Sequence, residues 1–256
     1  MKVLLYQFHI KNFFPTEKYG AYWELSHESC RRYAETYGFD YKLDLYENKE
    51  SWTPLFSFIQ EPQWEQFRAI RYLKDYDAVL FVDSDVLIRS DADNIIHKYG
   101  NADSNILANT RIGNIILGTD YELNTLQFNT GVVLWFNKSR HTDNFYELKP
   151  KIYGQHKGHF VLSKFVENRK KLRWWENWED LQNFVGKYPT GRYHDEKFLS
   201  LIISLFDLQL GHLDCKYNYR FINETLFNNH FEYAQFIHYP GKKKAYMQKH
   251  YNLIVI

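Results

Sequence analysis

Apolar and polar positions follow two kinds of pattern along this chain. Short continuous apolar runs predict strands near residues 3–8, 41–45, 78–82, 106–109, 131–136 and 208–213. Apolar residues spaced three to four apart predict helices near residues 16–37, from 62 onward, and near 139–148, 159–171, 177–187 and 194–206. Strands that alternate with helices in this way predict an α/β sandwich.

The organisation along the chain predicts one domain. No internal repeat, low-complexity tract or clear linker divides residues 1–256. Residues 147–193 differ in character, because they are rich in Lys, Gly, His and Trp and lie between two regularly patterned halves. We interpret this segment as an insertion over the active face, near an acceptor site, rather than as a separate domain.

Composition narrows the class of protein. Hydrophobic residues make up 45% and charged residues 25%, which is typical of a folded globular chain. Lys and Arg number 32 against 31 Asp and Glu, so the basic excess expected of a nucleic-acid-coating protein is missing and no nucleic-acid partner is expected. Two cysteines are too few for a disulfide framework or a CxxC zinc site.

Hydropathy along the chain bears on location. The first apolar run is too short for a signal peptide, and no run approaches the roughly eighteen residues of a membrane span. These features predict a cytoplasmic protein whose contact with a membrane, if it has one, is peripheral.

Asp-x-Asp triplets occur three times, at residues 75–77, 83–85 and 91–93. The first precedes a predicted strand, and the third resembles the cap and first turn of a helix. Asp83 and Asp85 instead follow the apolar run AVLFV, at the carboxyl end of a strand that is covered on both faces, where α/β sheets bind ligands. Two adjacent carboxylates repel each other unless a cation lies between them. The hard oxygens predict Mn²⁺ or Mg²⁺ bridging a diphosphate.

Around this triplet the sequence resembles a known family. WEQFRAIRYLKDYDAVLFVDSDVLI, residues 64–88, is similar to the helix–strand–DxD core of glycosyltransferases with the GT-A fold, nearest to the glycogenin and lipopolysaccharide-galactosyltransferase group and the related galactosyl- and xylosyltransferases. Three later motifs agree in type and order: FNTGVVLWFNKS at 128–139, HDEKFLSLII at 194–203 and FIHYPGKKK at 236–244. The resemblance covers roughly residues 60–245, with gaps. It implies a single-domain, Rossmann-like nucleotide-diphospho-sugar transferase sandwich, with a mixed central sheet flanked by helices.

The resemblance also implies roles for individual residues. The metal ligands for Mn²⁺ or Mg²⁺ would be Asp83, Asp85 and His238. Contacts to the nucleotide-sugar donor would come from Tyr6, Arg68, Asp83, Ser84, Asn129, Thr130, Gly131, Gly241, Lys242, Lys243 and Lys244. Asp195 and Glu196 would lie beside the transferred sugar and the acceptor as catalytic residues. Trp174 and Trp175 are candidates for binding a glycan-type acceptor, because indole rings stack on sugars.

Each of these residues also has a structural interpretation. His238 is in a position where an ordinary strand-end histidine would fit, and residues 242–244 could form a solvated turn. Asn129 could cap a turn, and Asp195 could be a helix N-cap. For the tryptophans of residues 174–178, core packing and a platform facing sugar or membrane are equally compatible with the sequence.

The activity implied is transfer of a sugar from a nucleotide-diphosphate sugar, most simply a UDP-sugar, to a glycan, glycolipid or protein acceptor. The family resemblance favours retention of configuration; an inverting enzyme would use Asp195 or Glu196 as the base. Two other classes remain open: a metal-dependent nucleotidyltransferase or phosphohydrolase, and a non-catalytic carbohydrate-binding protein with a relic metal site. Detection of donor hydrolysis would separate an enzyme from a binding protein.

Overall fold

The computed structural model describes residues 1–13, 21–55, 62–110, 128–138 and 208–255. The predicted helices between residues 139 and 206, the predicted insertion at 147–193, and the candidate residues Trp174, Trp175, Asp195 and Glu196 lie outside these ranges. Among the described residues, none of the helices combines the length and the apolar character needed to cross a bilayer.

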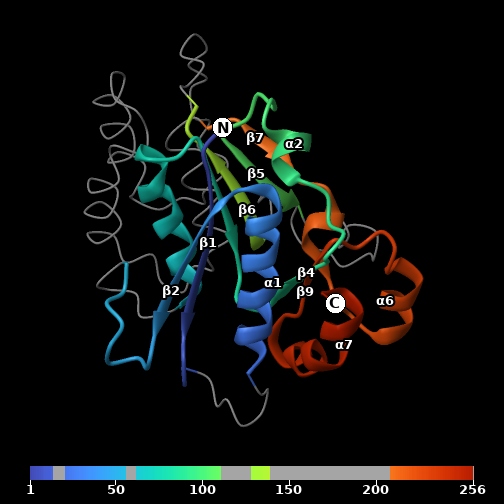
Figure 1. Ribbon diagram of the computed structural model, residues 1–256. Helices are drawn as coiled ribbons and strands as arrows, with labels where there is room; N and C mark the ends of the chain where they lie inside the picture. Colours follow the sequence, from blue (N-terminus) through green and yellow to red (C-terminus); the bar gives the residue numbers. More distant parts are fainter. Residues whose placement is uncertain (14–20, 56–61, 111–127, 139–207, 256) are drawn as a thin grey trace, which may run out of the picture.

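A mixed sheet forms the centre of the described structure (Figure 1). Its strands are β1 (Val3–Ile10), β2 (Asp40–Tyr46), β3 (Ala78–Val82), β5 (Ile106–Thr110), β6 (Phe128–Phe136) and β7 (Leu210–His212), in the spatial order β2-β1-β3-β6-β5-β7. β1 is parallel to β2 and β3, β6 is antiparallel to β3 and β5, and β5 is parallel to β7. Each of these strands was predicted from an apolar run, although β6 begins three residues earlier than expected. The mixed sheet flanked by helices confirms the predicted fold class.

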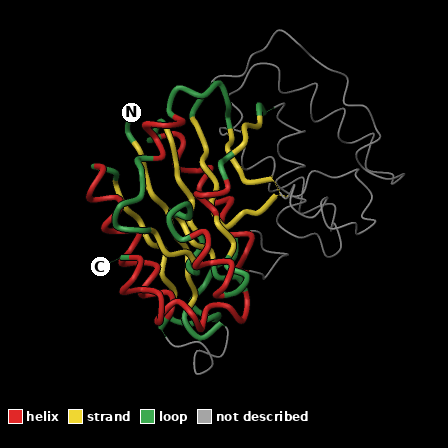
Figure 2. The backbone as a smooth tube through the Cα atoms, turned by 90° about the vertical axis from the view of Figure 1, so that its right-hand side faces the viewer, coloured by secondary structure: helices red, strands yellow, loops and turns green. Residues whose placement is uncertain are grey.

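Two helices cover opposite faces of this sheet (Figures 1 and 2). The α-helix α1 (Tyr22–Tyr37) packs on the face that contains Val3 and Leu5, and the 3₁₀-helix η2 (Pro62–Lys74) packs on the face that contains Leu4 and Tyr6. All eight residues of β1 are therefore buried, since successive side chains of a strand point to opposite faces.

The ends and the winding of these helices follow from the sequence. Gly38 ends α1 with a left-handed φ of 68°, and its N–H caps the last turn. A glycine at this position predicts the end of a helix, and the structure confirms it. The sequence predicted a helix from Pro62, and the helix formed is the tighter 3₁₀ type. Its buried apolar residues recur every three positions, which matches three residues per turn: Trp64, Phe67, Ile70 and Leu73.

A second, smaller sheet lies beside the first and was not predicted. It contains β4 (Val86–Ile88), β9 (Phe236–His238) and β8 (Tyr219–Arg220) in the order β4-β9-β8. β4 is antiparallel to β9, and β8 is parallel to β9. Around it lie η6 (Cys215–Asn218), α6 (Glu224–His230), η7 (Gly241–Tyr246) and α7 (Met247–Ile254). Residues of α6 and α7 close a separate apolar cluster that includes Leu87, Phe221 and Ile237. Strands of two or three residues are too short to leave a periodic signal in the sequence.

The third Asp-x-Asp triplet is not a helix cap. Helix α2 (Ile95–Tyr99) is capped by Asn94, whose side-chain oxygen accepts hydrogen bonds from the N–H groups of Ile96 and His97. The prediction for residues 91–93 is thus wrong in detail, because the neighbouring asparagine supplies the cap and the two aspartates pair with cations instead.

Candidate functional site

The segment that carries Asp83, Ser84 and Asp85 connects β3 to β4, so it leaves the large sheet and enters the small one. Its backbone is held from several sides. The N–H of Asp83 donates to the carbonyl of Gly131 on β6 at 2.8 Å. The carbonyl of Asp83 accepts from Gln7 Nε2 on β1 and from Ser26 Oγ on α1, each at 3.3 Å. The backbone of Asp83 is therefore held by three elements of the core.

Strand pairing brings His238 to these carboxylates. In the register of β4 with β9, Val86 lies opposite His238, and the N–H of Tyr239 donates to the carbonyl of Asp85 at 2.8 Å. His238 Nε2 then lies 3.3 Å from Asp85 Oδ1 and 4.0 Å from Asp83 Oδ2. The side chains of Asp85 and His238 are only 10% and 9% exposed. The three residues predicted to act together thus do meet in space.

The chemistry of this cluster suits a divalent cation. One ligand atom from each of Asp83, Asp85 and His238 lies within 4.8 Å of the others. Asp85 Oδ2 accepts from Lys244, but Asp85 Oδ1 and His238 Nδ1 are buried without a hydrogen-bond partner among the described residues, which leaves one carboxylate oxygen of Asp85 for a cation. Carboxylate oxygens with one imidazole nitrogen form a donor set that Mn²⁺ accepts readily and that Mg²⁺ accepts through its oxygens. The residues present therefore fit the predicted metal.

Lys244 sets the electrostatics of the cluster. Its Nζ contacts Asp85 Oδ2, and it lies 5.0 Å from the centre of the Tyr22 ring. Burial alone would raise the pKa of Asp85, but the charges of Lys244 and His238 outweigh burial and hold that pKa well below its ordinary value. Burial alone would lower the pKa of Lys244, but Asp85 outweighs burial and raises it. Both groups are consequently charged at neutral pH.

The other residues of the predicted closing turn lie in different surroundings. Gly241 has a left-handed φ of 59°, a conformation that favours glycine, and it redirects the chain into η7. Lys242 is exposed, and the Nζ of Lys243 lies about 6 Å from the ring centres of Phe221 and Tyr246. Of the three predicted lysines, Lys244 is the one that the described structure places against the carboxylates.

The predicted N-T-G segment of β6 lies against His238. Asn129 and Thr130 are buried, and a Cβ added to Gly131 would lie 2.4 Å from His238 Nδ1. Gly131 thus adjoins the candidate metal cluster, and Asn129 and Thr130 directly precede it on β6. Their predicted contact with the donor sugar stays a prediction.

Two predicted donor contacts are not brought to the cluster. Tyr6 is fully buried, packs against Tyr72 with ring centres 5.2 Å apart, and donates its hydroxyl to Asp44 at 3.0 Å. A ring with no exposed surface cannot stack on a base, so the structure corrects the assignment of Tyr6. Its even position in β1 directs the ring toward η2.

Arg68 lies on η2 and has structural partners. It forms an ion pair of 2.6 Å with the buried Glu65, and it donates to the carbonyl of Thr53 at 3.0 Å. These contacts tie the 3₁₀-helix to the preceding loop. The described contacts of Arg68 therefore support a structural role and leave the predicted donor contact as a prediction.

One group near the site was missed at the level of sequence. His9, at the end of β1, has its Nδ1 3.0 Å from Ser84 Oγ, and its ring stacks on Trp23 with centres 5.2 Å apart and planes at 16°. Burial lowers the pKa of His9 to about 4, and the nearby charge of Lys244 acts in the same direction. The available signal was position, because the carboxyl ends of parallel strands β1 and β3 meet at one edge of the sheet.

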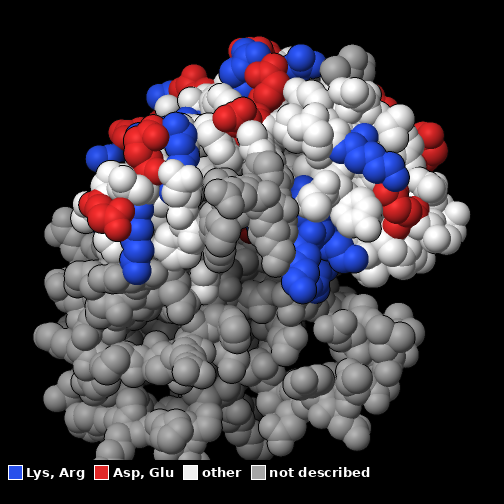
Figure 3. Space-filling view, turned by 90° about the horizontal axis from the view of Figure 1, so that it is seen from below, with Lys and Arg blue, Asp and Glu red and all other residues white. Residues whose placement is uncertain are grey.

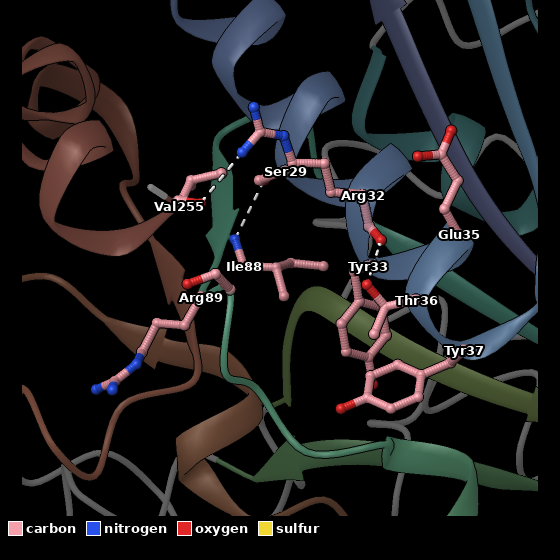
Figure 4. A pocket seen from close by; sticks show the side chains of 10 residues that line it. Ser29, Arg32, Tyr33, Glu35, Thr36, Tyr37, Ile88, Arg89 and Val255 are labelled. Atoms are coloured by element: carbon pink, nitrogen blue, oxygen red, sulfur yellow. Dashed lines mark hydrogen bonds between the residues drawn. The ribbon is translucent and has the colours of Figure 1, made fainter.

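A cavity of about 240 Å³ opens elsewhere, between α1, β4 and Val255 (Figure 4). Arg32 Nη1 donates to the carbonyl of Val255 at 3.3 Å, and Ser29 Oγ accepts from the N–H of Ile88 at 3.2 Å. The guanidinium of Arg89 points away from the cavity in Figure 4. The polar groups of this cavity do not converge, and none of the residues that line it was predicted as a site residue. The cluster of Asp83, Asp85 and His238 therefore remains the candidate site.

Charge is mixed on the surface as well. In the view from below, Lys and Arg side chains are interspersed with Asp and Glu over the described part of that face (Figure 3). This agrees with the nearly balanced totals of basic and acidic residues in the chain.

Comparisons with known proteins identify the fold. No protein-family model matches the chain, and no curated protein matches it either. Among solved structures, a glycosyltransferase involved in the glycosylation of the major capsid of PBCV-1 is 17% identical, with 99% of this chain and 100% of that chain covered and a TM-score of 0.53. The galactosyltransferase LgtC, in complex with donor and acceptor sugar analogues, is 13% identical, with 98% and 96% covered and a TM-score of 0.49. Mouse xyloside xylosyltransferase 1 is 11% identical, with 93% and 97% covered and a TM-score of 0.42.

At such low identity the similarity bears on fold. The match to the first of these structures covers 99% of this chain and 100% of that chain, and this chain has the mixed central sheet flanked by helices that is described above. The chain therefore has the GT-A fold of the glycosyltransferases that its sequence resembles.

Proposed function

We propose that this protein is a metal-dependent glycosyltransferase. It transfers a sugar from a nucleotide-diphosphate sugar, a UDP-sugar in our proposal, to a glycan, glycolipid or protein acceptor. The observation that carries the proposal is the convergence of Asp83, Asp85 and His238 at the carboxyl end of β3 within a GT-A fold. A glycosyltransferase among the structures of similar fold supports the same class of reaction.

Asp83, Asp85 and His238 would hold Mn²⁺ or Mg²⁺, and the bound ion would supply positive charge to the diphosphate that leaves during transfer. Lys244 is the protein's own cation at the same place, since it lies against Asp85. Its ammonium is held in position by the carboxylate and the Tyr22 ring, so it can stabilise developing negative charge without a costly rearrangement.

The nucleoside of the donor has a candidate position in place of Tyr6. His9 fixes the hydroxyl of Ser84, and the partly exposed Trp23 stacks on His9 at the same edge of the sheet. Because flat aromatic faces stack on nucleobases, we place the nucleoside beside Ser84 and Trp23.

The sugar and the acceptor would lie on the other side of the cluster. Gly131 adjoins His238, and together with Asn129 and Thr130 it forms the proposed wall toward the donor sugar. Asp195 and Glu196 are the proposed catalytic carboxylates, and the segment with Trp174 and Trp175 is the proposed acceptor surface. The family resemblance favours retention; in an inverting reaction one of the two carboxylates would take the proton of the acceptor hydroxyl.

Thermal unfolding with UDP, with and without Mn²⁺, tests the proposal. At a hundredfold excess of UDP over its dissociation constant, stabilisation of about 2.7 kcal/mol is expected with Mn²⁺ and none with EDTA. Equal stabilisation in the two conditions would contradict the metal-dependent site.

A panel of nucleotide sugars, each assayed for metal-dependent release of nucleoside diphosphate, then identifies the donor and the reaction. Release that increases with a glycan acceptor supports transfer. Inorganic phosphate or a transferred nucleotidyl group as product would instead indicate a phosphohydrolase or nucleotidyltransferase. Binding without turnover would indicate a carbohydrate-binding protein.

A further inference from the structure

Gly131 lies at the joint between the two sheets and contacts two of the candidate metal ligands. Its carbonyl accepts the hydrogen bond from the N–H of Asp83 at 2.8 Å. Its α-carbon faces the imidazole of His238: an added Cβ would lie 2.4 Å from Nδ1, 2.5 Å from Cε1 and 3.1 Å from Cγ. Real Cβ atoms essentially never approach another heavy atom closer than about 3 Å, so a methyl group here would have to displace the ring.

The backbone that carries the imidazole is fixed by strand pairing. β9 is paired with β4 on one side and with β8 on the other, and the carbonyl of His238 accepts from the N–H of Phe221 at 2.8 Å. The ring itself is buried and has Nε2 3.3 Å from Asp85 Oδ1. Displacement of the ring by a methyl group would therefore change the position of Nε2 relative to the carboxylates.

A buried asparagine pair fixes Gly131 relative to the small sheet. Asn129 Oδ1 accepts from the N–H of Gly131 at 3.1 Å and from Asn218 Nδ2 at 3.0 Å. Asn218 Nδ2 also donates to the carbonyl of Asn129 at 3.0 Å. Asn218 directly precedes β8, the neighbour of the strand that carries His238. The hydrogen bonds thus connect the glycine on β6 to the sheet that positions the histidine.

We propose that Gly131 is a positioning residue of the metal site. Its lack of a side chain leaves the space that the His238 imidazole occupies, which we call the seat of His238, and its carbonyl accepts a hydrogen bond from Asp83. The Asn129–Asn218 hydrogen bonds hold this seat in place between the two sheets. The inference rests on the proposed function, because it takes Asp83, Asp85 and His238 to be the metal ligands. It gives the glycine a role that does not depend on contact with the donor sugar.

A double-mutant cycle with Mn²⁺ alone tests the seat. Affinity for Mn²⁺ is measured by electron paramagnetic resonance of the free ion in the parent chain, Gly131→Ala, His238→Ala and the double variant. Gly131→Ala should lower affinity at least tenfold in the parent, and less than twofold once His238 is alanine, because the ring that it displaces is then gone. Equal losses in both backgrounds would overturn the proposal.

Gly211→Ala is the matched control. Gly211 is on β7 of the same large sheet, and its added Cβ would lie 2.3 Å from Leu107 Cδ2 and 2.5 Å from Ser104 Oγ. It therefore introduces a comparable clash outside the cluster, and it should lower stability while Mn²⁺ affinity stays within twofold of the parent. An equal loss of Mn²⁺ affinity in this control would overturn the proposal, since general destabilisation would then explain both variants.

Further outcomes separate the seat from a sugar contact and from the function itself. If Gly131→Ala weakens a UDP-sugar but not Mn²⁺, the glycine contacts the sugar and the seat is overturned while the proposed function stands. If His238→Ala leaves Mn²⁺ affinity unchanged, the metal site is wrong and the seat falls with it. Should Gly131→Ala fail to fold, recovery of folded protein on adding His238→Ala supports the seat, and continued misfolding overturns it.

Discussion

The triplets at residues 83–85 and 91–93 have the same spacing and flank the same short strand, β4, yet their surroundings differ. The carboxylate of Asp85 is buried and faces both His238 and Lys244. Asp91 and Asp93 are 66% and 56% exposed and form separate ion pairs with different cations. Asp83 and Asp85 share the partner His238 where the two sheets meet, whereas Asp91 and Asp93 each pair with a separate cation at the surface.

The difference shows that spacing is a poor guide to a metal site. Arg89 neutralises Asp91, and Lys216 neutralises Asp93, so each charge of the third triplet is already compensated near water. In the second triplet, only Asp85 is buried; Lys244 pairs with it, and His238, a third candidate ligand, comes from another strand. Convergence of ligands in a buried place, and not the Asp-x-Asp pattern, separates the two.

The largest effect is expected from matched substitutions in the two triplets. Asp85→Asn should lower the affinity for UDP in the presence of Mn²⁺ at least a hundredfold, because a carboxylate ligand is lost, and the stabilisation of about 2.7 kcal/mol should disappear. Asp93→Asn makes the same change in charge and should alter affinity less than twofold. Isothermal titration with UDP and Mn²⁺ measures both, and similar losses would mean that the triplets do not differ in function.

A second prediction concerns the pH dependence of stability through His9, the histidine that contacts Ser84 in the second triplet. His9 has a pKa of about 4 in the folded chain, against an ordinary value near 6.5, so the unfolded state binds its proton first as the pH falls. Stability should thus be highest above pH 6.5 and should fall by about 3 kcal/mol between pH 6.5 and pH 4 through this group.

Urea unfolding across that pH range checks the prediction. His9→Gln should remove this part of the pH dependence, because glutamine does not titrate. His97→Gln, on the exposed side of α2 after the third triplet, is the control and should keep the profile of the parent. An unchanged profile in His9→Gln would contradict the buried, neutral histidine.

A third, smaller effect compares the two lysines that pair with the triplets. Lys244 and Lys216 have side chains that are 14% and 16% exposed, so their burial is similar. Lys244→Met should weaken UDP binding at fixed Mn²⁺ about tenfold, since it removes roughly one charge-assisted contact to the diphosphate. Lys216→Met should change it less than twofold. Titration calorimetry distinguishes the two, and equal effects would exclude a specific role for Lys244.

The smallest effect is expected at the surface pair of the third triplet. Asp91→Ala removes the ion pair with Arg89 and should lower the free energy of unfolding by about 0.5 kcal/mol, because the Asp91 side chain is 66% exposed and Arg89, whose side chain is 10% exposed, keeps its hydrogen bond to the carbonyl of Phe231. Equilibrium urea unfolding measures the change. A loss of several kcal/mol would show that this triplet, too, is part of a buried network.

The sequence by itself determined the large sheet, the helix α1 and the position of Asp83 and Asp85. These features have local signals: continuous apolar runs, three-to-four spacing, and Gly38 at a helix end. The order of the motifs placed His238 among the predicted ligands before any strand near it was predicted.

Tertiary structure decided which side chains meet. Tyr6 and His9 stand three residues apart on one fully buried strand, and apolar character alone could not tell which face holds the site. The structure directs Tyr6 to η2 and His9 to α1, so the base-contact prediction failed at Tyr6. A difference of one position in a strand reverses the face, and only packing partners reveal it.

The contacts between the large and the small sheet likewise could not be predicted from the sequence. β4 and β9 have three residues each, and their pairing brings Lys244 to Asp85 across 159 positions of chain. Gly131 and Asn129 carry no local sign that they seat a histidine from another sheet. Such contacts depend on the packing of the whole core, because the free energy of a two- or three-residue strand is too small to fix its own partner.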